Sequence, residues 1–182
     1  MNDAIAEGLS GVLTAAQAWA AALGLQASPL PAGPMVDLMA AGPNVRADAL
    51  HYLVNHQVWA RLEGDGTATV GVTSMGIRAA GEIYMCRPKW PGSVIEQGRS
   101  IAVVELAKSI VSVKSPVRGT VAAINAALEK TPELVHRDPY GQGWLARVQL
   151  ADFDADRAAL LHGEPVAAAM AHHAWLSRQD EA

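Results

Sequence analysis

The chain has 182 residues, of which 51% are apolar and 18% are charged, and its formal net charge is −4. This composition is typical of a soluble globular protein that is long enough to bury a core, and it excludes a disordered chain. Basic residues are not concentrated along the sequence and no apolar run is long enough to cross a bilayer, so neither a nucleic-acid partner nor a membrane is expected.

Residues 1–46 are predicted to form a helical extension followed by a proline-rich linker. Apolar side chains recur in residues 1–24 at alternating spacings of four and three, as on one face of an amphipathic helix. Three prolines between Ser28 and Pro34 favour an extended linker. No Lys or Arg precedes Arg46, so we expect neither a secretory signal nor a mitochondrial transit peptide, and we predict a cytoplasmic protein.

Residues 47–151 are predicted to form a β domain. Short apolar and β-branched runs alternate here with turn signals such as GDG at 64–66 and PG at 91–92. The runs cover residues 56–62, 67–74, 81–87, 100–106, 109–116, 119–125 and 143–150. Short strands at this spacing indicate a sandwich or a barrel.

Residues 152–182 regain a helical composition. We predict helices over 152–162 and 164–178, the second beginning near Pro165, because proline is tolerated in a first helical turn. The fold class predicted from the residues is therefore mainly β, with helical additions at both ends.

One lysine stands between two predicted strands. The sequence Glu105-Leu106-Ala107-Lys108-Ser109 separates two β-branched runs, which places Lys108 at a hairpin turn. An exposed lysine on a stiff hairpin suits covalent acylation and later delivery of the attached group to a partner. PGSVIEQG before the lysine and SPVRGTVAAIN after it each form a turn followed by a strand, which predicts a local two-fold axis near Lys108.

Four ordered segments carry a family resemblance. They are EGDGTATVGVT at 63–73, PGSVIEQG at 91–98, the run from Val103 to Val135, and DPYGQGWLARVQL at 138–150. Over roughly residues 51–152 the chain resembles the biotinyl/lipoyl carrier domains, above all the H protein of the glycine cleavage system. The resemblance implies a lipoyl-type β-sandwich, a barrel-sandwich hybrid.

The resemblance also implies a role for two residues. The family attaches lipoate to the lysine of a Glu-Ser-x-Lys-Ala motif, of which Glu105 and Lys108 are retained here. Lys108 would carry covalent lipoate, and Glu105 would be recognised by a lipoate ligase or lipoyl transferase. The implied partners are a pyridoxal-phosphate glycine decarboxylase, an aminomethyltransferase and dihydrolipoamide dehydrogenase. The chain itself would be a carrier and not an enzyme.

Three alternatives remain open at this point. The element Pro88-Lys89-Trp90-Pro91-Gly92 is similar to one in lipoate-binding carriers of sulfur-oxidation systems with heterodisulfide-reductase-like complexes. The altered lysine motif also leaves a non-lipoylated scaffold in consideration. Biotin is disfavoured because no methionine flanks Lys108.

Other reactive side chains receive structural interpretations. Cys86 is the only cysteine, which excludes an intramolecular disulfide, and it is interpreted as a small buried hydrophobe. His172 and His173 are adjacent on a predicted helix and therefore point in different directions, which argues against a shared metal ion. His56 aligns with a family histidine, and Lys114 is interpreted as a surface residue.

Overall fold

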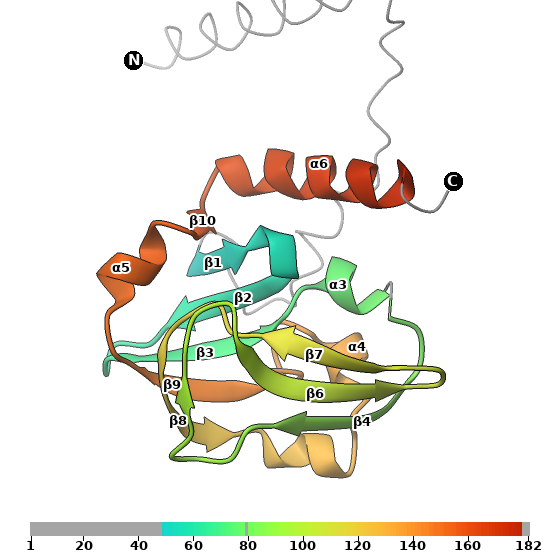
Figure 1. The fold of residues 1–182 in the computed structure, drawn as a ribbon, viewed down its shortest axis with the longest axis horizontal. Coiled ribbons are helices and arrows are strands. Elements are labelled where there is room, and N and C mark those ends of the chain that lie inside the picture. The colour runs from blue at the N-terminus through green and yellow to red at the C-terminus, as the bar shows by residue number, and fades with distance from the viewer. Residues whose placement is uncertain (1–48, 79, 180–182) are drawn as a thin grey trace, which may run out of the picture. The chain divides into compact units, whose positions relative to one another are not determined.

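Two antiparallel β-sheets form the framework of the protein in the computed structural model (Figure 1). The structure describes residues 49–78 and 80–179, so the predicted N-terminal helix and linker lie outside it. The larger sheet has seven strands in the order β10-β1-β2-β3-β9-β8-β5, and the smaller has the order β4-β6-β7. The strands are β1 Leu50–Leu53, β2 Val58–Leu62, β3 Thr67–Val72, β4 Ile83–Pro88, β5 Val94–Ile95, β6 Ser100–Leu106, β7 Ile110–Lys114, β8 Gly119–Ile124, β9 Ala146–Leu150 and β10 Leu161–His162.

Short helices connect these strands, and one longer helix ends the described chain. The helices are η2 Val54–His56, α3 Ser74–Arg78, η3 Ala126–Glu129, α4 Leu134–Arg137, α5 Phe153–Arg157 and α6 Pro165–Gln179. No helix among the described residues combines the length and apolar character needed to span a membrane.

The predicted fold class is confirmed. Each of the seven predicted runs contains a strand, and the two sheets form a sandwich. In the described chain the larger sheet ends at β10 and β5, so it does not close into a barrel. The strand predicted within PGSVIEQG is present as β5, whereas the pattern missed the short strands β1 and β10 and the helix α3.

The main core lies between the two sheets. Buried side chains from the larger sheet, such as Val70 and Val148, belong to one apolar cluster with Cys86 and Val104 of the smaller sheet. Positions 102–105 of β6 alternate between buried and exposed, as period-2 patterning predicts for a strand with one face in a core. In β4 the buried residues Ile83 and Cys86 are three positions apart, because the pairing with β6 shifts register between Ile83 and Met85. This shared core fixes the smaller sheet on the larger one.

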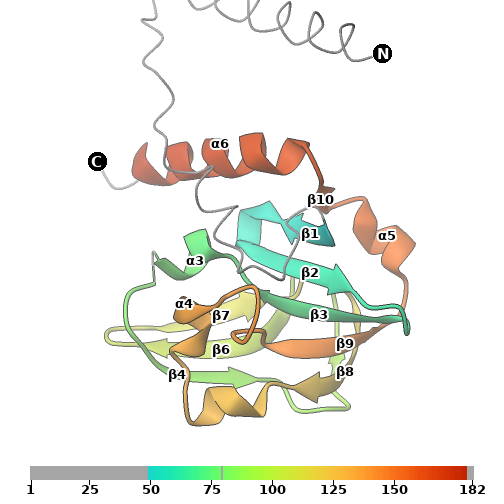
Figure 2. The ribbon, with the colours of Figure 1, turned by 180° about the vertical axis from the view of Figure 1, so that it is seen from behind.

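A second apolar cluster attaches α6 to the larger sheet. Val166 and Met170 of α6 pack with Tyr52, Trp59 and Tyr140, all of them buried. The Trp59 indole nitrogen donates to the carbonyl oxygens of Val72 at 3.0 Å and Pro139 at 3.2 Å. Figure 2 shows α6 lying over β1, away from the smaller β4-β6-β7 sheet.

The predicted helix over 152–162 is wrong beyond Arg157. Leu161 and His162 instead form β10, pairing with Tyr52 and His51 of β1. Helical composition could not show this, because the pairing partner lies more than 100 residues earlier in the chain. The second predicted helix is confirmed as α6.

A buried carboxylate ties α5 to the sandwich. Asp156 has no exposed surface and accepts hydrogen bonds from the Arg118 backbone nitrogen at 2.6 Å and the Arg118 Nε at 2.7 Å. The Asp156 carbonyl oxygen also accepts from the Gln97 amide at 2.9 Å. Because a buried charge is costly without such partners, these contacts fix the place where the chain leaves the β domain.

Asp156→Asn is expected to lower the free energy of unfolding by about 2 kcal/mol, because it removes charge from two hydrogen bonds and leaves a buried amide mispaired. Urea denaturation measures this change. Asp154→Asn is the matched control, since the Asp154 side chain is 93% exposed and its contact with Arg157 is 3.7 Å. Equal stability of the two variants would contradict the structural role of Asp156.

Two histidines stack where β1 meets β10. The rings of His51 and His162 are 4.3 Å apart at their centroids, and Phe153 meets His51 edge-on at 5.1 Å. The buried His51 Nδ1 has no hydrogen-bond partner within the described chain. Burial, followed by the nearby charges of His162 and Arg157, lowers the pKa of His51 below its usual 6.5. The folded state therefore favours the neutral ring.

The lowered pKa predicts that the protein loses stability in mild acid. The unfolded chain binds more protons than the folded one below about pH 6.5, so the stabilisation is complete above that pH and is lost as pH falls through it. His51→Phe keeps the ring but cannot titrate, and it should flatten the decline in unfolding free energy between pH 7 and pH 5. His172→Gln, at an exposed histidine of α6, should retain it. Identical slopes in wild type and His51→Phe would refute this assignment.

Candidate functional site

The hairpin of β6 and β7 carries Lys108. Cross-strand pairs run from Ala102 and Val113 to Glu105 and Ile110 in constant register. The Leu106 backbone nitrogen donates to the Ser109 carbonyl oxygen at 2.8 Å, so only two residues form the turn. β-Branched residues fill both strands, which favours a stiff extended backbone on each side of it. The hairpin end projects from the sandwich at the right of Figure 1.

Both residues singled out in the lysine motif are exposed. Lys108 is the second turn residue, and Glu105 lies on β6 opposite Ile110. The structure gives no ion pair between Lys108 and Glu105, and none from Lys108 to any other described residue. The Lys108 ammonium is therefore accessible on a well-positioned backbone. Lys114 is half-buried at the far end of β7.

The strand pairs on either side of Lys108 are nested, and the local two-fold axis stays a prediction. β5 pairs with β8 through Ile95 and Gly119, and β6 pairs with β7, so both pairings are centred on the turn that contains Lys108. Gly119 is required for this arrangement, because a Cβ there would lie 2.0 Å from the Gln149 carbonyl oxygen. The turn thus rests on two nested strand pairs.

A groove of about 360 Å³ lies beside this hairpin, and sequence reasoning did not find it. One wall comes from the hairpin, including Leu106 and Val111, and the other from η2 and α3, including His56 and Ile77. The remaining lining residues are Asn55, Gln57, Val72, Gly76, Ala80, Val104, Ser112, Val113 and Lys114. Its walls are mainly apolar with a polar end at η2, so it suits a small apolar group.

Gln57 fixes the η2 side of the groove. Its φ of +53° lies in the left-handed region, where a non-glycine residue is uncommon. The side chain is held on both sides, since its amide nitrogen donates to the Val54 carbonyl at 2.9 Å and its amide oxygen accepts from the Thr73 hydroxyl at 2.6 Å. A local sequence pattern does not predict this left-handed conformation of Gln57.

The remaining reactive side chains do not gather at this site. Cys86 is buried in the main core, and burial raises the pKa of its thiol to about 12. Within the part of the chain that the structure describes, no three His, Cys, Asp or Glu side chains are grouped as metal ligands. The geometry therefore offers an exposed lysine next to a groove, without a catalytic cluster.

Comparisons with known proteins identify the family of the chain. The family model described as "Glycine cleavage H-protein" matches residues 50–173. The glycine cleavage system H protein 2 of Aquifex aeolicus is 38% identical over 115 residues, covering 63% of this chain and 71% of that protein. The H protein of Opitutus terrae is 42% identical over 120 residues, covering 65% and 91%.

A solved structure shares the fold. The crystal structure of a glycine cleavage system H protein from Mycobacterium marinum is similar with a TM-score of 0.54 and 27% identity, covering 64% of this chain and 91% of that one. The family match extends across β1, β10 and most of α6, beyond the segments that sequence reasoning had used. On these findings, the chain belongs to the glycine cleavage H-protein family.

Proposed function

We propose that this chain carries lipoate as an amide on Lys108 and shuttles an aminomethyl group during glycine decarboxylation. As a member of the H-protein family it is a carrier and not an enzyme. The observation that supports Lys108 is its place at the exposed turn of the β6–β7 hairpin, free of partners among the described residues. The matched relatives support glycine cleavage over the sulfur-oxidation alternative.

The residues at the hairpin fit covalent lipoate. An acylating enzyme must reach the lysine nitrogen, and a two-residue turn with no covering side chain allows this. When attached, the dithiolane supplies thiol–disulfide chemistry at the end of a flexible arm. The chain's own task is to hold the base of that arm. Leu106, Ile77 and Val111 offer apolar contacts for it in the adjacent groove.

Recognition by the lipoylating enzyme is assigned to Glu105. This carboxylate is exposed three residues before Lys108, on the same rigid hairpin. A lipoate ligase or lipoyl transferase that reaches the turn would meet Glu105 on the outer side of β6. Leu106 and Ser109 differ from the family motif, so Glu105 is the retained recognition feature beside Lys108.

The proposal extends to partners and setting. The carrier would serve a pyridoxal-phosphate glycine decarboxylase, an aminomethyltransferase and dihydrolipoamide dehydrogenase in the cytoplasm. We further propose that residues 47–151 are the carrier domain proper, with 1–46 and 152–182 as additions to it.

Incubation with lipoate, ATP and a lipoate ligase should add one lipoyl group to the wild-type protein, measured by intact mass and peptide mapping. Lys108→Arg should remain unmodified, whereas the control Lys114→Arg should be modified fully. Glu105→Gln should slow modification about tenfold, because the ligase loses one charged contact. An adduct that persists in Lys108→Arg, or no adduct from either a general or a cognate ligase, would disprove the assignment.

Cys86 is expected to take no part in the thiol chemistry. With a thiol pKa of about 12, only roughly 10⁻⁴ of Cys86 is thiolate at pH 8, and the side chain is buried. An aromatic disulfide reagent should therefore detect no thiol in the folded unlipoylated protein, one after denaturation, and two in the folded, lipoylated and reduced protein. Cys86→Ser should abolish only the thiol seen on denaturation. A thiol that titrates in the folded, unlipoylated chain would refute this expectation.

A further inference from the structure

The outer face of the three-stranded sheet continues directly from the Lys108 turn. The strand register sets its side chains in rows: Glu105 stands opposite Ile110, and the next row brings Arg87, Val103 and Ser112 together. At about 3.3 Å per residue, Val103 lies roughly 13 Å along β6 from the turn that contains Lys108. Any protein that reaches the end of the hairpin therefore approaches this face.

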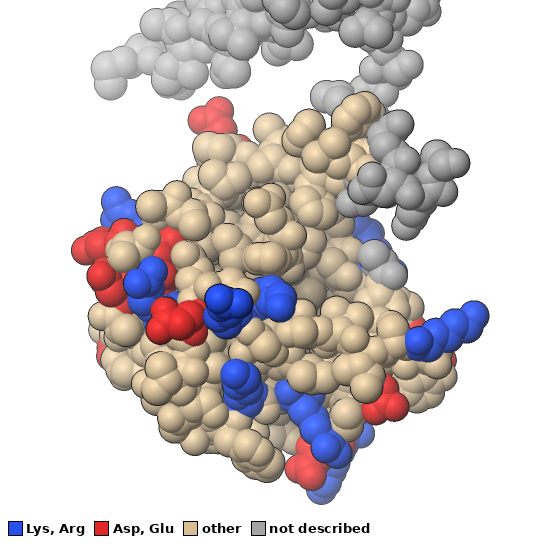
Figure 3. All heavy atoms as spheres, in the orientation of Figure 1, with Lys and Arg blue, Asp and Glu red and all other residues tan. Residues whose placement is uncertain are grey.

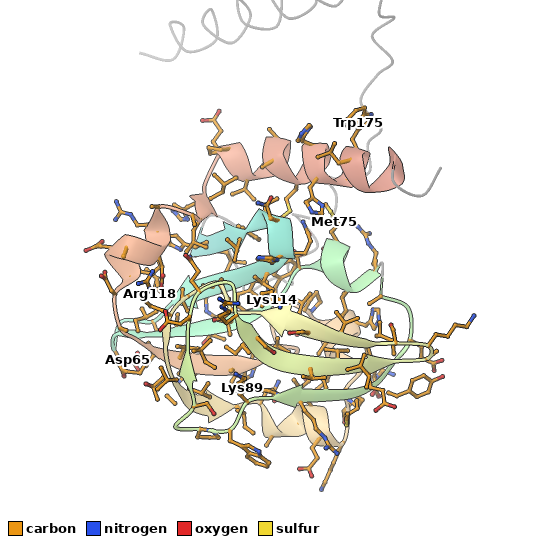
Figure 4. The ribbon with its side chains drawn as sticks, in the orientation of Figure 1. Asp65, Met75, Lys89, Lys114, Arg118 and Trp175 are labelled. Carbon is orange, nitrogen blue, oxygen red and sulfur yellow. The ribbon has the colours of Figure 1, made fainter. Side chains whose placement is uncertain are left out.

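Cations gather at the base of this face, from positions scattered in the sequence. The Lys89 backbone nitrogen donates to the Ile101 carbonyl at 2.8 Å, and Lys114 stands opposite the neighbouring Ser100. The Ser115 nitrogen donates to the Arg99 carbonyl at 2.7 Å, which places Arg99 beside Lys114. Figure 3 shows blue side chains across this surface, and Figure 4 labels Lys89 and Lys114 on it. We call Arg87, Lys89, Arg99 and Lys114 the basic face.

The charge on the basic face is not neutralised within the described chain. None of its four members forms an ion pair there, whereas other arginines do: Arg118 pairs with Asp156, Arg137 with Glu133 and Arg157 with Asp154. Arg87, Lys89 and Arg99 are exposed. The net charge of the chain is −4, so unpaired positive charge concentrated on one face can orient the protein as it approaches a negatively charged partner.

Exposed apolar side chains accompany these cations. Trp90, next to Lys89 in the sequence, is 77% exposed. Val103, in the middle of the face, is 37% exposed. Tryptophan and arginine are the residues most often found at the energetic centres of protein interfaces. Apolar contact area with flanking charges of one sign is the pattern of a protein-docking surface.

We propose that the basic face docks an acidic protein surface, namely the carboxylate-lined surroundings of the site that receives the arm on a partner enzyme. This inference rests on the proposed carrier function. Attraction at the base of the hairpin orients the carrier so that Lys108 points toward the partner. Repulsion between the partner's carboxylates and the carrier's own exposed carboxylates disfavours wrong orientations.

The test measures the KM of the fully lipoylated carrier in the reactions of glycine decarboxylase and dihydrolipoamide dehydrogenase from the same organism. At low salt, Lys89→Glu and Arg99→Glu should each raise the KM about threefold in at least one reaction, and the double variant roughly tenfold, with kcat unchanged. Lys89→Gln should have a smaller effect than Lys89→Glu. Salt should raise the wild-type KM toward that of the double variant.

The matched control is Arg147→Glu, which changes the charge by the same amount at an exposed position of β9 in the larger sheet. If Lys89→Glu and Arg99→Glu change the KM no more than this control does, the docking proposal is overturned. A wild-type KM that does not change with salt would also overturn it, and neither result would contradict the carrier function. Sedimentation that shows the face variants breaking a dimer would assign the face to a second copy and overturn it as well. Intact mass distinguishes the other failure, since a chain that takes no lipoyl group on Lys108 overturns the proposed function and this inference together.

Discussion

The antiparallel register between β6 and β7 is the constraint on which the site depends. Glu105 lies opposite Ile110 and Leu106 bonds to Ser109, which leaves two residues for the turn and makes Lys108 the second of them. A slip of one residue would exchange the two faces of a strand, turning Val104 out of the core and Glu105 into it. The burial of Val104, Val113 and Ala102 therefore fixes the position of an exposed lysine that itself contacts no described partner.

Sequence patterns predicted the strands whose own residues show a strand pattern. Runs such as 100–106 and 119–125 alternate or are rich in β-branched residues, and each contains a strand. β10 was missed because it pairs with β1 through His162 and His51, and no local pattern reports so distant a partner. β1 pairs mainly with the nearby β2 and was missed because a strand of 4 residues carries little pattern. The helix predicted over 152–162 failed for the same reason, since tertiary pairing overrides helical propensity at Leu161 and His162.

The candidate site also combines residues that the sequence predicted with features that it did not. Lys108 and Glu105 were predictable because a hairpin turn is local, and both are exposed on it. The groove was not predictable, because it depends on a left-handed Gln57 and on α3 approaching the hairpin from an earlier part of the chain. The basic face was not predictable from composition either. Lys89 and Lys114 are 25 positions apart and come to one face only because both flank β6, Lys89 through Ile101 and Lys114 through Ser100.

A carrier needs a mobile arm on an immobile base, and the contacts of this chain separate the two requirements. Two nested strand pairs centred on one turn hold the base, and the shared core holds the strands. The polar contacts that need burial, such as those of Asp156 with Arg118, lie at the other end of the sandwich near α5. Loss of those contacts would loosen the C-terminal elements before it disturbed the turn. Rigidity around Lys108 thus derives from the pairing of β6 with β7 and from the apolar core beneath them, which leaves the hairpin's outer charges available for partners.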